Sequence, residues 1–164
     1  MQITSQSAML FLPFVCPLCL YVAWSDMRTM RIPNLAVIAL LGVFMVVGLI
    51  ILPPSEYGWR LTHIVVVLLI GMGLNAGGLV GAGDAKFSAA AAPFVAFGDM
   101  RLLMAVFAAT LLSAWVTHRI AKYSPIRRAV PDWDSWDRGW DFPMGLALGG
   151  TLIIYLALGA IYGT

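Results

Sequence analysis

Long apolar runs separated by short polar stretches extend along the whole chain. A transmembrane helix needs about 20 mostly apolar residues, because the hydrocarbon core of a bilayer is about 30 Å thick. Six runs are candidates for such helices: residues 7–24, 35–52, 61–80, 87–97, 102–117 and 144–162. The pattern predicts an all-α, polytopic membrane protein, with about six transmembrane helices bundled in a single domain over residues 1–164.

One of these runs is unusually short, and one of the linkers between them is rich in proline. Residues 87–97 are alanine-rich, and about 11 residues are too few to cross a bilayer core. We expect this helix to begin nearer Asp84, or to be a buried or re-entrant helix packed among the others. Residues 53–56 contain two successive prolines and are predicted to form a turn, because proline does not continue a helix.

Composition supports the membrane class. Of the 164 residues, 61% are hydrophobic and only 11% are charged, with a mean hydropathy of +0.89. Soluble domains have about 25% charged residues, so a soluble fold this apolar would have too few charges to cover its surface. The net charge of +2 is too small to indicate a nucleic-acid partner.

The distribution of charge predicts an orientation. If the six spans alternate in direction, the linkers after the first, third and fifth spans share one face, and that face holds 8 of the 10 lysines and arginines. The positive-inside rule places this face in the cytoplasm and both termini outside. The eight residues are Arg28, Arg31, Lys86, Arg119, Lys122, Arg127, Arg128 and Arg138.

Two aspartates are candidates for chemistry because of their positions. Asp26 and Asp84 lie at the cytoplasmic ends of the first and fourth spans, where an ionisable side chain is costly to bury. Gly81 and Gly83 precede Asp84 and allow another backbone to approach closely. Each aspartate alone is better explained as capping or flanking a helix, but two on one face, one within Gly-x-Gly-Asp, favour a functional pair. Asp99, on the opposite face, is interpreted as part of a turn.

These residues carry a resemblance to a known family. Asp26 is followed by Arg-Ile-Pro-Asn at residues 31–34, and Gly-Ala-Gly-Asp-Ala-Lys occupies residues 81–86. This combination resembles the prepilin peptidases, or type IV leader peptidases, which are GxGD intramembrane aspartyl proteases. Residues 142–149 also resemble the start of the family's last span, although Met144 replaces the usual tyrosine there.

The resemblance implies a reaction and its residues. Asp26 and Asp84 would be the catalytic pair in a general acid–base hydrolysis that needs neither metal nor cofactor. Because Asp84 begins a helix and Asp26 ends one, the helix dipole favours Asp84 as the base and Asp26 as the acid. Lys86 is interpreted as binding a lipid headgroup or an acidic substrate residue, or as a simple anchor. The residues expected along the substrate approach are Gly81, Gly83, Lys86, Ile32, Pro33 and Asn34.

The resemblance also implies a substrate, a membrane location and partners. The substrate would be a prepilin, cleaved after its basic leader at the cytoplasmic face of a bacterial inner membrane, beside lipid and the pilus assembly machinery. Family members with a methyltransferase region carry two Cys-x-x-Cys pairs, whereas this chain has only Cys16 and Cys19, which we interpret as apolar residues of a helix. It looks like the short, peptidase-only form that accompanies Flp/Tad-type pili, and we expect no methyl transfer.

Two other functions fit parts of the pattern. A proton- or ion-coupled transporter also uses membrane aspartates and glycine-interrupted helices. A non-catalytic subunit of a pilus or secretion assembly would use the polar stretch at residues 119–141 to dock its partners. Loss of function on neutralising either aspartate would favour the protease over the assembly subunit.

Overall fold

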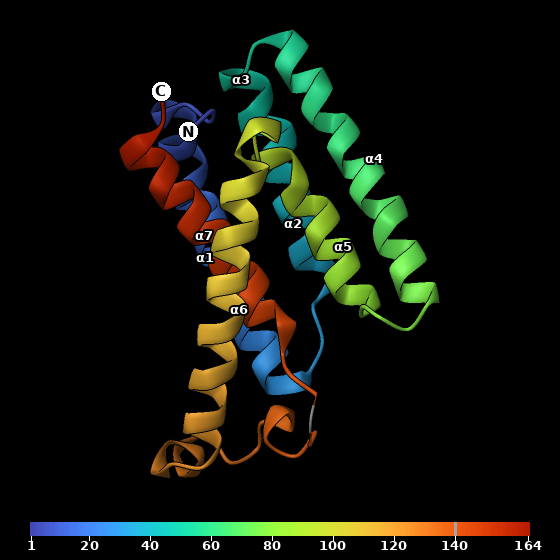
Figure 1. The fold of residues 1–164 in the computed structure, drawn as a ribbon, viewed down its shortest axis with the longest axis vertical. Helices are drawn as coiled ribbons and strands as arrows, with labels where there is room; N and C mark the ends of the chain where they lie inside the picture. The colour runs from blue at the N-terminus through green and yellow to red at the C-terminus, as the bar shows by residue number, and fades with distance from the viewer. Residues whose placement is uncertain (140) are drawn as a thin grey trace.

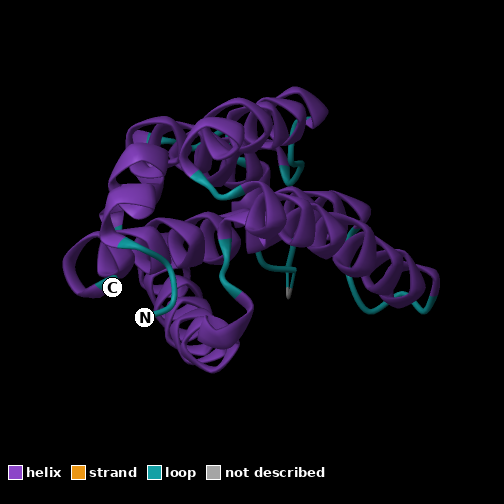
Figure 2. Cartoon of the chain, turned by 90° about the horizontal axis from the view of Figure 1, so that it is seen from above, coloured by secondary structure: helices purple, strands orange, loops and turns teal. Residues whose placement is uncertain are grey.

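The computed structural model describes residues 1–139 and 141–164, whose secondary structure is entirely helical (Figures 1 and 2). The α-helices are α1 (Ser5–Thr29), α2 (Asn34–Val43), α3 (Leu49–Ile51), α4 (Pro54–Ala76), α5 (Ala82–Ala91), α6 (Met100–Lys122) and α7 (Met144–Tyr162). A π-helical turn, η1 (Phe44–Gly48), joins α2 and α3 into one continuous helix. The connections contain the 3₁₀ turns η2 (Ala92–Phe94), η3 (Phe97–Asp99), η4 (Pro125–Ala129) and η5 (Asp134–Trp136).

Within the described residues, five helical segments are long and apolar enough to cross a membrane, which confirms the all-α, polytopic prediction. They cover residues 5–29, 34–51, 54–76, 97–122 and 144–162. The predicted span at residues 87–97 is not among them. In its place α5 begins at Ala82 and ends at Ala91, so this helix starts before Asp84, as the short run suggested, and covers about half the length that a bilayer core requires.

The turn predicted at residues 53–56 is shorter in the structure, where α3 ends at Ile51 and only Leu52 and Pro53 connect it to α4. Helix α4 begins at Pro54, because proline at the first helical position lacks only an N–H that has no intrahelical partner there. Glu56 and Arg60 then fall one helical turn apart and form an ion pair with an N–O distance of 2.6 Å. The polar residues are therefore accommodated inside the helix, and the span starts earlier than hydropathy indicated.

Arg60 also fixes the far end of the short helix. Its side chain is only 2% exposed and donates hydrogen bonds to the carbonyl oxygens of Pro93 and Phe94, at 3.3 and 3.2 Å. Pro93 has no N–H to continue α5, so the chain leaves the helix there and exposes carbonyl groups that need donors. Arg60 supplies those donors, and it ties α4 and the α5–η2 segment into one hairpin.

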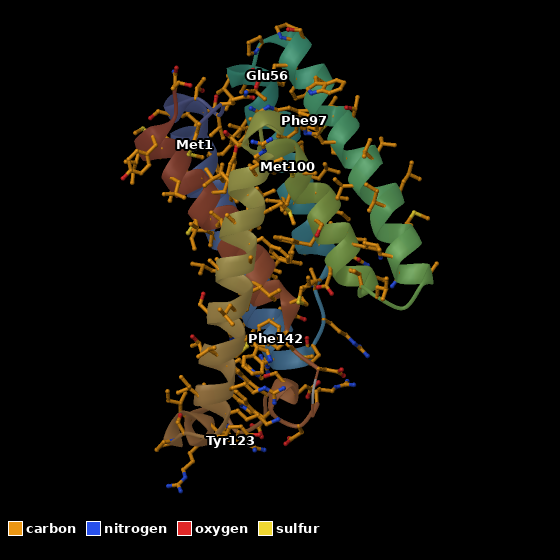
Figure 3. All side chains as sticks on the ribbon, in the orientation of Figure 1. Met1, Glu56, Phe97, Met100, Tyr123 and Phe142 are labelled. Atoms are coloured by element: carbon orange, nitrogen blue, oxygen red, sulfur yellow. The ribbon has the colours of Figure 1, made fainter. Side chains whose placement is uncertain are left out.

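The chain crosses the bundle repeatedly, and its connections alternate between two ends. In Figure 1 the two termini lie together at one end, while the α1–α2, α4–α5 and α6–α7 connections lie toward the other. Figure 3 likewise places Met1, Glu56 and Phe97 near one end and Tyr123 and Phe142 toward the other. Even though α5 is short, α5 and η2 return the chain to the end that carries the termini. The end of α1 that contains Asp26 and the α4–α5 connection that precedes Asp84 therefore lie toward the same end of the molecule.

Aromatic packing and glycine contacts hold the bundle together. Phe11 of α1 meets Phe94 edge to face with ring centroids 4.9 Å apart, and Phe44 of η1 meets Phe94 at 5.4 Å. The most extensive helix pair is α1 with α7. There a Cβ at Gly149 would lie 2.9 Å from the carbonyl oxygen of Cys19, so only glycine permits this approach.

Asp99 is more than a turn residue. It ends η3 and precedes α6, as expected of a turn, but it is 6% exposed and accepts three hydrogen bonds. The donors are the backbone N–H groups of Gln2 and Ile3, at 2.8 and 3.0 Å, and the hydroxyl of Tyr155, at 2.9 Å. The carboxylate therefore ties the N-terminal residues and α7 to the start of α6, at the end of the bundle away from Asp26.

Candidate active site

Asp26 lies in the last turns of α1 and is buried, with 5% of its surface exposed. The helix ends at Thr29, and Met30 turns the chain by adopting a left-handed conformation with φ of 52°. The Met30 N–H donates to the carbonyl oxygen of Asp26 at 2.8 Å, which closes the helix at this point. The Asp26 side chain instead faces α7, where the backbone N–H of Gly145 donates to its Oδ2 at 2.7 Å.

Asp84 lies in the first turn of α5 and is half-buried. Gly81 precedes the helix in an extended conformation, and the Asp84 carboxylate folds back over it. A Cβ at Gly81 would lie 2.7 Å from Asp84 Oδ2, and a Cβ at Gly83 would lie 3.3 Å from Ile32 Cβ. The two glycines thus have separate roles: Gly81 leaves room for the carboxylate, and Gly83 leaves room for the α1–α2 linker.

Both aspartates line one pocket of about 350 Å³, although they are 58 positions apart in sequence. Residues of the α1–α2 linker, of α5 and its N-terminal approach, and of the start of α7 form its walls. The lining residues are Asp26, Met30, Arg31, Ile32, Asn34, Gly81, Ala82, Gly83, Asp84, Lys86, Phe142 and Met144. Two carboxyl groups facing one cavity of this size can act on opposite sides of a single bound group.

The site residues predicted from the sequence are brought together with one exception. Ile32, Asn34 and Lys86 line the pocket, and Lys86 Nζ donates to Asn34 Oδ1 at 3.3 Å, which links α5 to the start of α2. Pro33 is not part of the lining. It precedes α2 as its N-cap residue, and its carbonyl oxygen accepts the N–H groups of Ala36 and Val37. Its place is therefore in setting the start of α2.

The Asp84 carboxyl group holds its proton to a higher pH than a free aspartate. Burial and the nearby charge of Asp26 together raise the pKa of Asp84 from 3.8 to about 6, while a hydrogen bond from the Gly81 backbone opposes the change. Two carboxylates that face one pocket cannot both ionise at low cost, so one proton remains shared across part of the pH range. A pair in these two states can remove a proton from one group and deliver a proton to another.

Sequence reasoning did not identify the contribution of α7. Gly145 holds Asp26 through its backbone, and Phe142 and Met144 contribute side chains to the pocket. The sequence of residues 142–149 indicates a family-like stretch but assigns it no role. The signal that was available is the spacing of Gly145 and Gly149, which places two glycines on one face of α7.

The polar linker before α7 packs onto the same end of the bundle. His118 of α6 is 2% exposed and stacks on Trp136, with ring centroids 5.1 Å apart, and it meets Phe142 edge to face at 5.7 Å. The Trp136 indole N–H donates to the carbonyl oxygen of Val130 at 2.8 Å, which anchors η5. Through Phe142 this aromatic stack supports one wall of the pocket.

The described residues offer no cluster of three or more histidine, cysteine or acidic side chains with the spacing of a metal site. Cys16 and Cys19 are free thiols within α1, in agreement with their interpretation as helix residues.

Comparison with known proteins identifies the family to which the sequence is similar. The sequence model of the type IV leader peptidase family matches residues 13–118, which is more than half of the chain. The matched region contains Asp26, the 31–34 motif and Asp84, and it ends before α7. No curated protein and no solved structure matches the chain significantly.

Proposed function

The chain belongs to the type IV leader peptidase family, and on this basis we propose that it is a membrane-embedded aspartyl endopeptidase that removes the basic leader of type IV or Flp-type prepilins. The observation that carries the proposal is the shared pocket, which is lined by both candidate carboxyl groups, Asp26 and Asp84. The family implies a peptidase with prepilin-like substrates. The aspartic mechanism, the Flp-type substrate and the cellular face are our proposals.

The proposed chemistry is general acid–base hydrolysis by Asp26 and Asp84. One carboxylate takes a proton from water, whose oxygen attacks the scissile carbonyl carbon, and the other carboxyl group protonates the carbonyl oxygen. The raised pKa of Asp84, about 6, supports a pair in which one group stays protonated while its partner is ionised. Lys86 and Arg31 line the same pocket and are available to hold a carboxylate or a lipid phosphate near the cleavage site.

The pocket is proposed to face the cytoplasm. Its lining residues belong to the α1–α2 linker and to the starts of α5 and α7. The α1–α2, α4–α5 and α6–α7 connections lie toward one end of the bundle (Figure 1). The same three connections, with their flanking helix ends, hold 8 of the 10 lysines and arginines. By the positive-inside rule this end belongs in the cytoplasm of a bacterial inner membrane, where the basic leader of a prepilin also lies.

We further propose that α7 is part of the same catalytic unit, although the family match ends before it. Gly145 of α7 contacts Asp26 directly, and α7 forms its most extensive packing with α1. A fragment that ended at residue 118 would lose both the Gly145 donor and the two lining residues Phe142 and Met144. The peptidase is therefore expected to require the chain through α7.

The test is cleavage of a co-reconstituted prepilin by Asp26→Asn and Asp84→Asn variants. Each change keeps the size of the side chain and removes a carboxyl group, so each should abolish cleavage, and the double variant should be little worse than either single one. Asp132→Asn is the matched control, because Asp132 is an exposed carboxylate at the same end of the bundle, outside the pocket. Near-normal cleavage by a correctly inserted Asp26→Asn or Asp84→Asn variant would contradict the aspartyl mechanism.

A further inference from the structure

The first turn of α7 meets the buried Asp26 carboxylate. The hydrogen bond from the Gly145 N–H to Oδ2 is 2.7 Å long and fully buried. The first four N–H groups of a helix have no partner within the helix, and the helix dipole adds partial positive charge at this end. Both effects stabilise a carboxylate anion much more than a neutral carboxylic acid. This contact therefore favours the ionised form of Asp26 and opposes the cost of burying its charge.

The close approach depends on glycine at this position. A Cβ at residue 145 would lie 2.9 Å from Asp26 Cβ and 3.0 Å from Oδ2, closer than ordinary van der Waals contact. Any other side chain would push α7 away from α1 and lengthen the hydrogen bond. Phe142, held against His118, fixes the chain just before the helix begins. The donor is therefore placed by a close helix contact on one side and by an aromatic contact on the other.

This contact changes the assignment made from sequence. Asp26 ends α1, and the carbonyl groups at a helix C-terminus disfavour a charge there, which is why the sequence predicted Asp26 as the acid. The N-terminus of α7, more than a hundred residues further along the chain, opposes that effect through a direct hydrogen bond. Asp84 also begins a helix, but α5 has 10 residues against 19 in α7.

We propose that Gly145 is a positioning residue whose backbone amide keeps Asp26 ionised, so that Asp26 is the general base and Asp84 the general acid. This inference rests on the proposed function. Asp26 takes a proton from water as the water oxygen bonds to the scissile carbon, and Asp84 gives its proton to the carbonyl oxygen, which produces a gem-diol. When the C–N bond breaks, Asp26 returns its proton to the leaving nitrogen and Asp84 recovers one from a diol hydroxyl, so both groups regain their starting states.

Other charged groups around Asp26 are the same in the two backbone-ester variants compared next. Asp84 and Lys86 of α5 and Arg31 of the α1–α2 linker line the same pocket. The first turn of α7 has no acidic side chain, and η5, which also packs on α1, has Asp134 in a different pocket. A change confined to one backbone amide leaves all of these charges in place.

The experiment replaces the Gly145 amide by an ester, using nonsense suppression with glycolic acid during cell-free synthesis into lipid discs. The ester removes one N–H and adds no side chain, and because the amide is in the first turn no intrahelical hydrogen bond is lost. The control is the corresponding ester at Leu146, the next amide of the same turn, which bonds to Pro143 at 3.3 Å. The readout is kcat/KM for cleavage of a prepilin precursor as a function of pH.

We expect the acid limb of the Gly145 ester profile to move upward by about one to two pH units, the equivalent of one hydrogen bond to a charged group. The Leu146 ester should move neither limb. If the basic limb moves instead, Asp26 is the acid and the proposal is overturned. If the rate falls with both limbs in place, the amide has only a structural role, which also overturns it.

A second measurement uses only simple variants and does not depend on activity. Asp84→Asn leaves Asp26 alone in the pocket, and Asp26→Asn leaves Asp84 alone, so infrared titration of the remaining carboxyl group compares their proton affinities directly. Asp26 should ionise at lower pH than Asp84, and the reverse order would refute the assignment. Retained cleavage by either variant would instead defeat the proposed function itself, so the two failures are distinguishable.

Discussion

Gly149 and Gly150 are neighbours in α7, but only Gly149 touches another helix. A Cβ at residue 149 would lie 2.9 Å from the Cys19 carbonyl oxygen and 3.4 Å from both the Cys19 carbonyl carbon and its Cβ, whereas a Cβ at residue 150 would meet no atom within 4 Å. The nearest of these atoms, the Cys19 carbonyl oxygen, belongs to the helical backbone of α1 and cannot rotate away as a side chain could. Gly149→Ala and Gly150→Ala therefore form a matched pair that separates helix propensity from helix contact.

The magnitude follows from two opposing effects. Replacing glycine by alanine inside a helix stabilises it by about 0.8–1.0 kcal/mol, and this gain applies to both variants. At residue 149 the two helices must also separate by about 0.5 Å to restore normal contact, and overpacking of this kind costs about 1–3 kcal/mol. Because the propensity effect cancels in the comparison, Gly149→Ala should be about 1–3 kcal/mol less stable than Gly150→Ala.

The assay is reversible unfolding of both variants in mixed micelles, followed by circular dichroism as denaturing detergent is added, with prepilin cleavage measured in parallel. Gly149→Ala should also lose activity, because Gly145 lies one helical turn away and its contact with Asp26 depends on the same helix spacing. Equal stability of the two variants, or greater stability of Gly149→Ala, would refute the inference that α1 and α7 are in rigid backbone contact here.

Gly81→Ala should abolish most cleavage while leaving stability nearly unchanged, because the added methyl group displaces only the tip of the Asp84 side chain. Gly42→Ala is the control, because a Cβ at residue 42 meets no atom within 4 Å. Normal cleavage by Gly81→Ala would contradict the site geometry. Asp84→Asn should stabilise the protein more at pH 8 than at pH 4. Folding raises the pKa of Asp84 from 3.8 to about 6, so the native state becomes progressively less stable as the pH rises from 3.8 to 6. The amide does not ionise and therefore removes this loss of stability. Unfolding curves at the two pH values test this, and an equal effect at both would count against it. In a cysteine-free background, a single cysteine at Ser55 should react with an impermeant reagent added to intact cells, and one at Ser124 should not; the opposite labelling would reverse the proposed orientation.

Hydropathy was sufficient to predict the class of fold and five of the helices, because a bilayer demands long apolar segments whatever their tertiary contacts. It failed where tertiary contacts decide the outcome. Helix α4 starts at Pro54 because Glu56 and Arg60 satisfy each other and Arg60 then caps the α5–η2 segment. The end of α5 follows from Pro93 and that same arginine. An ion pair and two long-range hydrogen bonds leave no trace in a hydropathy profile.

The candidate site was predictable as far as local motifs extend. Asp26, Asp84 and their neighbouring glycines were identified because each motif occupies a few consecutive residues, and a shared face could be inferred from alternating spans. The role of Gly145 was not predictable, since it acts through a backbone N–H that every residue except proline carries. Asp99 was underestimated for a related reason: two of its three donors are backbone N–H groups of Gln2 and Ile3, far away in sequence.

The two aspartates lie on two separately packed groups of helices, the α4–α5 hairpin and the α1–α7 pair. Helix α4 packs mainly on α5 and η2, and Arg60 joins α4 to η2 at the far end of the hairpin, so these helices form one packed body that bears Asp84. Asp26 belongs to a second body, the α1–α7 pair. Each body carries one of the two proposed catalytic carboxyl groups, and a misplacement of about 1 Å between reacting groups can cost a factor of about 10² in rate. Bilayer thickness, which sets the tilt of a long helix such as α4, is thereby coupled to the alignment of the two halves. The lipid composition of the membrane is expected to tune turnover without unfolding either body.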